Sequence, residues 1–257
     1  MMDTSKLFRL DNRVALITGS SQGLGKVLSK GLADAGARVV LNGRDPHKLK
    51  GTVEEFRASG YDAYGYAFDI TKRVEVDPAI ERIEREVGPI EILVNNAGIQ
   101  RRAPLHEVTD ETWDEVIATN LTGAFVVSRK VAQGMIQRQR GKIIFTCSLM
   151  SELGRTTTGP YTAAKGGVRM LIRAMCVDWA RYNIQINGIG PGYFITEMTK
   201  PLADNPEFNT WLMGRTPARR WGNPEELIGA LLLLASDAGN FINGQIIYVD
   251  GGILAAL

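Results

Sequence analysis

Residues 148–165 contain the side chains most suggestive of chemistry. Ser148 follows an apolar run, and Tyr161 and Lys165 come four positions apart in the next segment. On a helix, residues four apart lie on one face, so the Tyr161 hydroxyl and the Lys165 ammonium can approach a single point. A fixed cation favours the phenolate form of a tyrosine, which would allow proton transfer near neutral pH. The spacing alone is more typical of a core tyrosine followed by a surface lysine, so the surrounding elements must decide.

A glycine-rich turn near the start of the chain is a candidate phosphate site. Residues 13–17 form an apolar run typical of a buried strand, and a helix-period segment follows to about residue 35. The glycines between them have the spacing G-x-x-x-G-x-G, which differs from the general G-x-G-x-x-G fingerprint. Such a turn lets the backbone approach a diphosphate, and the N–H groups at the helix N-terminus can bind it. The predicted contacts are Gly19, Ser21, Gly23, Leu24 and Gly25.

Arg44 follows the second expected strand, at residues 37–42, and bears on the choice of dinucleotide. An NAD site places an acidic residue in this neighbourhood to accept from the ribose 2′-hydroxyl. Here the positions are occupied by Gly43 and Arg44. A guanidinium can clamp a phosphate with paired, charge-assisted hydrogen bonds, which favours the 2′-phosphate of NADP. Asp45 remains an alternative acceptor for a ribose.

Apolar runs alternate with helix-period segments along the whole chain, which is typical of βαβ units and a parallel sheet covered on both faces. Further strands are expected at residues 63–68, 90–94, 142–147, 184–189 and 245–249, with helices at about 48–59, 74–87, 161–182 and 224–236. Ligands of such sheets bind beyond the carboxyl ends of the strands. The candidate residues just past these ends are Asp69, Ile70, Asn95, Asn96, Ala97, Gly98, Ser148, Pro191, Gly192, Phe194 and Thr196.

Two further segments are candidates for roles in a site. A long helix is expected over residues 110–138, with Asn120 in an otherwise apolar environment. A buried amide must be hydrogen-bonded, so it either supports a backbone group or belongs to a site, and its position alone does not choose. Periodicity weakens over residues 197–222. An irregular excursion of this length is usually functional, which favours a lid over a plain packing insertion.

Composition and charge exclude several function classes. The 257 residues suit one domain, and 30 basic against 28 acidic residues, dispersed along the chain, give no electrostatic case for nucleic acid. Cys147 and Cys176 are too few for a disulfide framework or a zinc site, and no metal site is predicted. The first ten residues lack the apolar run of a signal peptide, and the apolar segment 227–235 is shorter than the ~20 residues that span a bilayer. A cytoplasmic protein without membrane contact is expected.

The order of these motifs resembles the short-chain dehydrogenase/reductase family. The matching features are Thr18 with Gly19, Gly23 and Gly25, then Asn95-Asn96-Ala97-Gly98, Asn120, Ser148, Tyr161 with Lys165, and Pro191-Gly192. The resemblance spans nearly the whole chain. It implies a doubly wound, seven-stranded parallel Rossmann sheet in a single three-layer α/β/α domain over residues 1–257. It also implies a nicotinamide cofactor, which Arg44 favours as NADP(H), and commonly a homotetramer.

The resemblance also implies a role for each catalytic residue. Tyr161 would be the general acid/base, and Ser148 would hydrogen-bond the substrate oxygen. Lys165 would hold the nicotinamide ribose and favour ionisation of Tyr161. Asn120 would hold a water that relays protons to solvent. The implied cofactor contacts are Gly19, Ser21, Gly23, Leu24, Gly25, Arg44, Asp69, Ile70, Asn96, Ala97, Gly98, Tyr161, Lys165, Pro191, Gly192, Phe194 and Thr196.

Finer stretches resemble those members of the family that act on sugar acids. These stretches are residues 95–102, 151–155, 191–200, 215–218 and 220–222. A sugar acid carries a carboxylate, which Arg101 or Arg102 can pair with, although a solvated basic pair is as consistent with either residue alone. Glu152 and Arg155 would contact the polyol or merely close their loop. Ser148 and Tyr161 would complete the substrate contacts.

Three alternatives remain beside a sugar-acid dehydrogenase of this kind. A related sugar acid oxidised at another carbon is the nearest, and a general carbonyl reductase is less consistent with the basic residues. A nucleotide-binding regulator that keeps the fold without turnover is the alternative from another class. That alternative predicts loss of Ser148, Tyr161 or Lys165, and all three are present.

Overall fold

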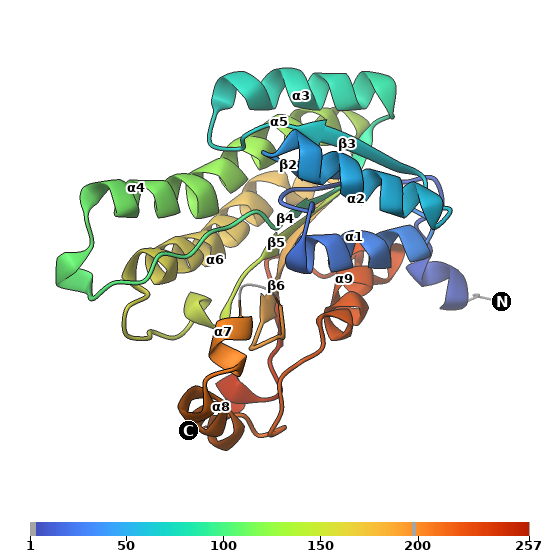
Figure 1. Cartoon of the computed structure of the whole chain (residues 1–257). Coiled ribbons are helices and arrows are strands. Elements are labelled where there is room, and N and C mark those ends of the chain that lie inside the picture. The colour runs from blue at the N-terminus through green and yellow to red at the C-terminus, as the bar shows by residue number, and fades with distance from the viewer. Residues whose placement is uncertain (1–3, 197–198, 257) are drawn as a thin grey trace.

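The computed structural model of the chain describes residues 4–196 and 199–256, and its centre is one parallel sheet (Figure 1). The strands run in the order β3-β2-β1-β4-β5-β6-β7, and every neighbouring pair is parallel. The expected seven-stranded, Rossmann-like sheet is therefore confirmed. Its strands are β1 (Val14–Ile17), β2 (Arg38–Gly43), β3 (Ala63–Ala67), β4 (Ile90–Asn95), β5 (Gly141–Thr146), β6 (Ile184–Pro191) and β7 (Ile246–Val249).

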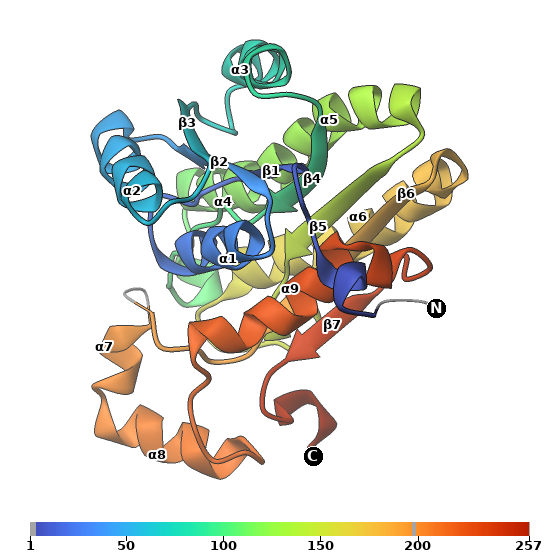
Figure 2. The ribbon, with the colours of Figure 1, turned by 90° about the vertical axis from the view of Figure 1, so that its right-hand side faces the viewer.

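Helices cover both faces of the sheet, as Figure 2 shows. One apolar cluster joins the sheet to α1 (Gly23–Asp34), α2 (Pro46–Ala58) and α9 (Ile228–Ala235). A second cluster joins the other face to α3 (Arg73–Glu86), α5 (Ala124–Arg138) and α6 (Gly159–Trp179). The central strands are mostly apolar because both of their faces are buried, as is usual for a parallel sheet, and charged side chains occur only near their amino ends.

The long helix expected over residues 110–138 is interrupted. It consists of α4 (Asp110–Ile117), a π-helical segment (Ala118–Gly123) and α5. The sequence does not reveal this change, because one wider turn displaces the spacing of the apolar residues by only one position. The apolar period therefore looks continuous. Such π turns are frequent at functional sites, and this one carries Asn120.

The segment expected to be irregular, residues 197–222, contains two helices. They are α7 (Lys200–Ala203) and α8 (Pro206–Arg215), while Glu197 and Met198 lie outside the described residues. The side chain of Asn205 accepts a hydrogen bond from the Phe208 N–H at 3.0 Å, which caps α8. The helical period is weak because few side chains of α8 are buried, so the apolar stripe that marks a packed helix is missing.

Other element boundaries differ from those expected by up to four residues. α2 begins at Pro46 and not at residue 48, because the Asp45 carboxylate accepts from the N–H groups of His47 and Lys48. β6 continues to Pro191, two residues past its expected end. The helix expected over residues 224–236 starts as a 3-10 turn (Pro224–Leu227), and α9 begins only at Ile228.

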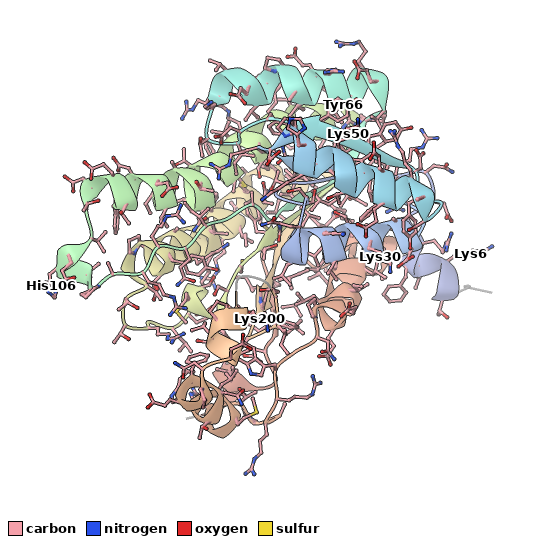
Figure 3. The ribbon with its side chains drawn as sticks, viewed as in Figure 1. Lys6, Lys30, Lys50, Tyr66, His106 and Lys200 are labelled. Carbon is pink, nitrogen blue, oxygen red and sulfur yellow. The ribbon has the colours of Figure 1, made fainter. Side chains whose placement is uncertain are left out.

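Exposed basic side chains are spread over different elements. Lys30 lies on α1, Lys50 on α2 and Lys200 on α7, and Figure 3 shows them on separate parts of the surface. Within residues 4–196 and 199–256, no helix is long and apolar enough to cross a bilayer. No group of three or more His, Cys, Asp or Glu side chains in the same ranges is arranged to hold a metal ion.

Candidate active site

Hydrogen bonds join the turns that follow β1 and β4. These two strands are neighbours in the sheet, at the point where the order of successive strands reverses. The Thr18 hydroxyl oxygen accepts from the N–H groups of Asn96 and Ala97, each at 3.1 Å. In return, the Asn96 amide donates to the carbonyl oxygens of Thr18 and Gly19, at 3.1 and 3.0 Å. In open α/β sheets this topological switch point is where ligands bind. Through its two hydrogen bonds, the side chain of Asn96 holds the glycine-rich turn in place at this point.

The glycine-rich turn has the form of a diphosphate cradle. Gly19 has φ +63°, and a Cβ there would lie 2.7 Å from Ala97 Cα, so only glycine fits this close approach. Gly23, the first residue of α1, also has a positive φ, and a Cβ there would point into open space. The N-cap residue Gln22 makes no side-chain hydrogen bond to α1. The free N–H groups of that helix end suit an anionic ligand, so these residues fit the diphosphate of a dinucleotide.

Asn42 is a site-shaping residue that sequence reasoning did not single out. Its side-chain oxygen accepts from the Gly19 N–H, and its amide donates to the carbonyl oxygens of Tyr66 and Phe68. It thereby fixes the glycine-rich turn against β2 and the end of β3. An amide in an otherwise apolar, buried strand is the signal that could have identified it, since buried polar groups are hydrogen-bonded.

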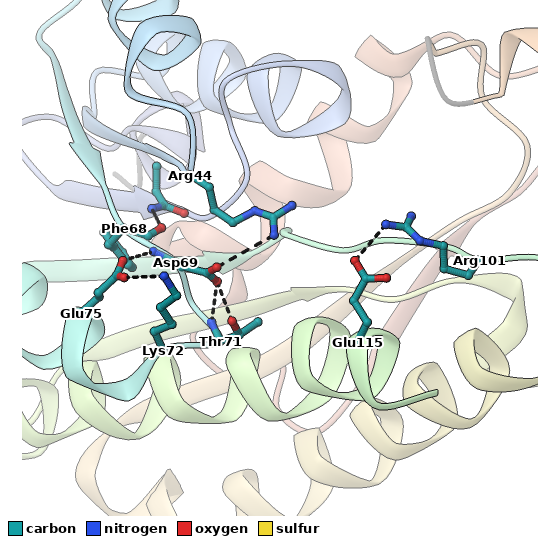
Figure 4. Close-up of polar contacts among 9 residues, drawn as sticks. Arg44, Phe68, Asp69, Thr71, Lys72, Glu75, Arg101 and Glu115 are labelled. Carbon is teal, nitrogen blue, oxygen red and sulfur yellow. Dashed lines mark hydrogen bonds and ion pairs between the residues drawn. The ribbon is translucent and has the colours of Figure 1, made fainter. Parts of the chain in front are cut away.

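Arg44 lies at the carboxyl end of β2 beside Asp69, as Figure 4 shows. The Arg44 side chain is 63% exposed, and its Nη1 is 3.9 Å from Asp69 Oδ2. The other Asp69 oxygen accepts from the Thr71 N–H and hydroxyl. Asp45 is the N-cap of α2, and its hydrogen bonds with the N–H groups of Lys48 and His47 hold its pKa below the usual range. Arg44 thus remains available to an anion, whereas Asp45 is engaged by its own helix.

Ser148 lies two residues beyond β5 as the N-cap of a 3-10 turn (Leu149–Ser151). Its oxygen accepts from the Met150 N–H at 3.2 Å, and its own N–H donates to Ser151. These bonds fix the direction of the side chain. Across the described part of the chain the hydroxyl proton has no acceptor, so it is available to a ligand oxygen.

Tyr161 and Lys165 lie one turn apart at the start of α6, as expected. Lys165 is 4% exposed, its Nζ donates to the Thr146 carbonyl oxygen at 2.5 Å, and it lies 5.5 Å from the centre of the Tyr161 ring. The Tyr161 hydroxyl makes no hydrogen bond within the described ranges. The ammonium is thus held between the end of β5 and the tyrosine ring, and the phenol is left open to a substrate.

The side chain of Asn120 supports the backbone of Ile99. Its oxygen accepts from the Ile99 N–H at 2.7 Å, and its amide donates to the Ile99 carbonyl at 2.8 Å. Asn120 is 2% exposed and also lies against Gly98. The structure therefore shows the backbone-supporting role that the sequence left open, and a water held by this residue remains a prediction.

The two adjacent arginines, Arg101 and Arg102, are in different electrostatic settings. Arg101 pairs with Glu115 on α4 at 2.9 Å (Figure 4). Arg102 has no ion pair or hydrogen bond to any described residue. Burial of part of its side chain, together with the charge of Arg155, lowers the pKa of the Arg102 guanidinium, while Tyr193 opposes that shift. Of the two candidates for a carboxylate partner, Arg101 is compensated by Glu115, and Arg102 is uncompensated within the described part of the chain.

Arg155 is held by an aromatic cluster that sequence reasoning did not predict. Its Nη1 donates to the Tyr193 hydroxyl at 3.0 Å, and its guanidinium lies 4.6 Å from the Phe208 ring centre. Tyr193 in turn packs edge-on against Trp211 and Trp221. Phe208 and Trp211 belong to α8, so this helix lies directly against the arginine. The aromatic residues scattered through an otherwise irregular segment were the available signal.

The carboxylate of Glu152 is bound to side chains of α6 and β7. Its carboxylate pairs with Arg169 of α6 at 2.8 Å and accepts from the Tyr248 hydroxyl of β7 at 2.9 Å. Burial and this hydrogen bond raise the pKa of Tyr248. The structure thus shows Glu152 closing its loop onto α6 and β7, and a contact with a polyol stays a prediction.

The remaining predicted cofactor contacts line the same edge of the sheet. Ile70 is buried against Gly123, and the Gly192 N–H donates to the Val249 carbonyl. Phe194 is 4% exposed and bridges to Gly222. Thr196 bonds with Thr199 just before α7. The backbone after β6 is thereby anchored at the crevice.

Both cysteines are unpaired. Cys147 lies directly before Ser148 and is 2% exposed. Burial raises the pKa of its thiol to about 12, so the group stays protonated at neutral pH and contributes packing rather than nucleophilic chemistry.

Comparison with known proteins identifies relatives that match along the whole chain. The sequence pattern of the short chain dehydrogenases matches residues 13–207. A 5-keto-D-gluconate 5-reductase of Escherichia coli is 50% identical over 251 residues, which cover 98% of this chain and 99% of the relative. A 2-dehydro-3-deoxy-D-gluconate 5-dehydrogenase of Formosa agariphila is 48% identical, covering 98% of this chain and 96% of the relative.

A solved structure agrees with these sequence relationships. A gluconate 5-dehydrogenase of Burkholderia cenocepacia, crystallised in complex with NADP and tartrate, superimposes with a TM-score of 0.97 at 50% identity. The alignment covers 99% of this chain and all of the relative.

Proposed function

We propose that this chain, which belongs to the short chain dehydrogenase family, reversibly interconverts D-gluconate and 5-keto-D-gluconate with NADP(H). The observation that carries the proposal is the uncompensated Arg102 beside Arg155, at the carboxyl edge of the sheet. Neither guanidinium has a carboxylate partner among the described residues, which suits an anionic substrate. The relatives named for gluconate and its 5-keto form supply the identity of that anion.

The catalytic residues have complementary tasks in this reaction. A bound nicotinamide supplies or accepts the hydride. Tyr161 gives a proton to the substrate oxygen in reduction and removes it in oxidation, and Ser148 donates a hydrogen bond to the same oxygen. Donors at that atom stabilise the charge that develops there in the transition state. Lys165 is positioned next to the tyrosine ring by its bond to Thr146, and in our proposal it also holds a ribose of the cofactor.

The helices α7 and α8 are proposed to act as a lid over the substrate. Phe208 and Trp211 of α8 lie against the Arg155 guanidinium. The charge of Arg155 is close enough to Arg102 to lower the pKa of the Arg102 guanidinium. An anion between the two arginines would therefore bind directly beneath α8. Such closure excludes water from the reacting groups.

Arg44 is proposed to bind the 2′-phosphate of NADP. Replacing it with aspartate is expected to lower the preference for NADP over NAD, measured as the ratio of kcat/KM values, by at least about tenfold. A hydrogen bond to a charged group contributes ~1.5–3 kcal/mol, and the exposure of Arg44 places the effect near the lower end. Replacing exposed Arg82 of α3 in the same way is the control. An unchanged ratio in the Arg44→Asp variant would show that another residue selects the cofactor.

The substrate assignment is tested by a spectrophotometric screen. D-gluconate, 5-keto-D-gluconate, 2-dehydro-3-deoxy-D-gluconate and 2-deoxy-D-gluconate are assayed with NADP(H) and with NAD(H). The highest kcat/KM is expected for the gluconate pair with NADP(H). A higher value for 2-dehydro-3-deoxy-D-gluconate would favour the second candidate, which the 48% identical relative supports. Turnover of neutral carbonyl compounds at equal efficiency would contradict a sugar-acid site, and binding of NADPH without any turnover would favour a regulator.

We also propose a homotetramer in the cytoplasm. Trp113 on α4 and Met170 and Val177 on the adjacent α6 are 40%, 56% and 82% exposed, which suits a helix-to-helix contact with another copy. Two unpaired cysteines suit a reducing compartment. Sedimentation is expected to give four copies per particle, and a monomer would contradict the assembly.

A further inference from the structure

A polar cavity of about 310 Å³ lies at the amino ends of β4, β5 and β6, on the edge of the sheet opposite to the candidate active site. Three basic side chains line it, namely Arg13, Arg140 and Lys142. A single water needs only ~10–15 Å³ of such volume, so the cavity is ample for a small ion and part of its hydration. None of these residues takes part in the reaction proposed above.

The charges around the cavity do not balance. Arg13 pairs with Asp237 at 2.8 Å, and Arg140 pairs with Glu91 at 3.2 Å. Lys142 has no carboxylate within ion-pair distance among residues 4–196 and 199–256. The cavity wall therefore carries three cations against two carboxylates, and the surplus charge is that of Lys142.

Lys142 is also the most buried of the three cations. Its side chain is 6% exposed, and its Nζ donates to the neutral side-chain oxygen of Asn240 at 2.8 Å. An ammonium group has three N–H donors, so two remain for a ligand in the cavity. A buried charge without a counter-charge is costly, which favours either its neutralisation or an anionic partner.

We propose that this cavity binds a small oxyanion, a carboxylate or phosphate group, through Lys142 with Arg13 and Arg140 beside it. The anion supplies the counter-charge that Lys142 lacks. The two arginines keep their own carboxylate partners and contribute long-range attraction and further N–H donors. Asn240 takes the remaining ammonium hydrogen bond and fixes the direction of Nζ.

The protonation of Lys142 links this site to pH. Burial, with smaller contributions from Arg13 and Arg140, lowers the pKa of Lys142 to about 8, and Asp237 opposes the shift. A bound anion favours the charged amine and raises that pKa, so binding near pH 8 takes up a proton. Affinity is expected to fall as pH rises above 8, because the free protein then holds the neutral amine.

The decisive variant is Asn240→Asp, which places a carboxylate where the amide oxygen now meets Lys142. Thermal unfolding midpoints are measured with saturating NADP⁺, which occupies the cradle at the opposite edge. Inorganic phosphate and acetate are titrated separately against chloride of equal ionic strength. The wild-type chain is expected to show a saturable rise in midpoint with at least one of the two anions. Asn240→Asp is expected to lose the anion-dependent rise, because the new carboxylate supplies the counter-charge of Lys142, and Lys142→Met is expected to lose it as well.

Arg102→Gln is the matched control, since it removes a cation from the proposed substrate site alone. It should keep the saturable rise, which separates this cavity from the site of the reaction. The proposal is overturned if neither anion exceeds chloride, if Asn240→Asp retains the full response, or if Arg102→Gln abolishes it. Asn240→Asp decides the question even if Lys142→Met fails to fold. A response to phosphate alone or to acetate alone identifies the oxyanion that the cavity accepts.

Discussion

Replacing Tyr161 with phenylalanine is expected to lower kcat by about 10²- to 10⁴-fold while leaving NADPH binding within about threefold of the wild type. A positioned general acid or base contributes a factor of this size. The substitution removes only the hydroxyl, which makes no hydrogen bond within the described part of the chain. Lys165 keeps its bond to Thr146, so the surroundings of the ring are preserved.

The measurement combines steady-state rates with a fluorescence titration of NADPH. Tyr64→Phe on the edge strand β3 is the matched control, because that hydroxyl lies on the outermost strand of the sheet, away from Ser148 and α6. The control is expected to keep its kcat. A Tyr161→Phe enzyme with more than about a tenth of the wild-type kcat would rule out Tyr161 as the acid/base, since the lower bound for that role is about a hundredfold.

Replacing Arg102 with glutamine is expected to raise KM for gluconate and its 5-keto form by about 10- to 100-fold. A hydrogen bond to a charged group is worth ~1.5–3 kcal/mol, and each ~1.4 kcal/mol is a factor of ten. Because the carboxylate does not change during the reaction, its partner binds ground state and transition state alike. The loss therefore falls mainly on KM, with kcat changed little.

The adjacent arginine offers an unusually close control. Arg101→Gln removes the same charge one position earlier, but Arg101 is already paired with Glu115. Its KM is expected to stay within about threefold of the wild type. Equal effects of the two variants would mean that general positive potential attracts the substrate, and a larger effect of Arg101→Gln would reverse the assignment of the carboxylate partner.

Much of the architecture was predictable because it depends on short-range patterns. Apolar runs of strand length alternating with helix-period segments require a parallel sheet with covered faces. That topology brings the carboxyl ends of the strands to one edge, so the glycine-rich turn, Arg44, Ser148 and the Tyr161 helix had to face the same crevice. The predicted element boundaries were wrong where a local interaction overrode the pattern, as at the Asp45 cap of α2 and the π turn around Asn120.

The partners of polar side chains were not predictable in the same way. Sequence alone left Arg101 and Arg102 equivalent, and the structure separates them because α4 brings Glu115 to only one of the two. It also left Asn120 undecided between a backbone support and a site residue, and the packing of the π segment places its amide on Ile99. Glu152 was expected to contact a polyol or close its loop, and α6 and β7 bring Arg169 and Tyr248 to it.

The sequence by itself thus determined the sheet, the place of the proposed catalytic residues on its carboxyl edge and the glycine-rich turn proposed to bind a diphosphate. Tertiary structure decided which cations are compensated, both at that edge and in the cavity around Lys142. The physical reason is the range of the interactions. Hydrophobic periodicity depends on residues within one or two turns of the chain. An ion pair or a buried hydrogen bond depends on groups that can be far apart in the sequence. Arg13 and Asp237 are 224 positions apart, and only packing brings them within 3 Å.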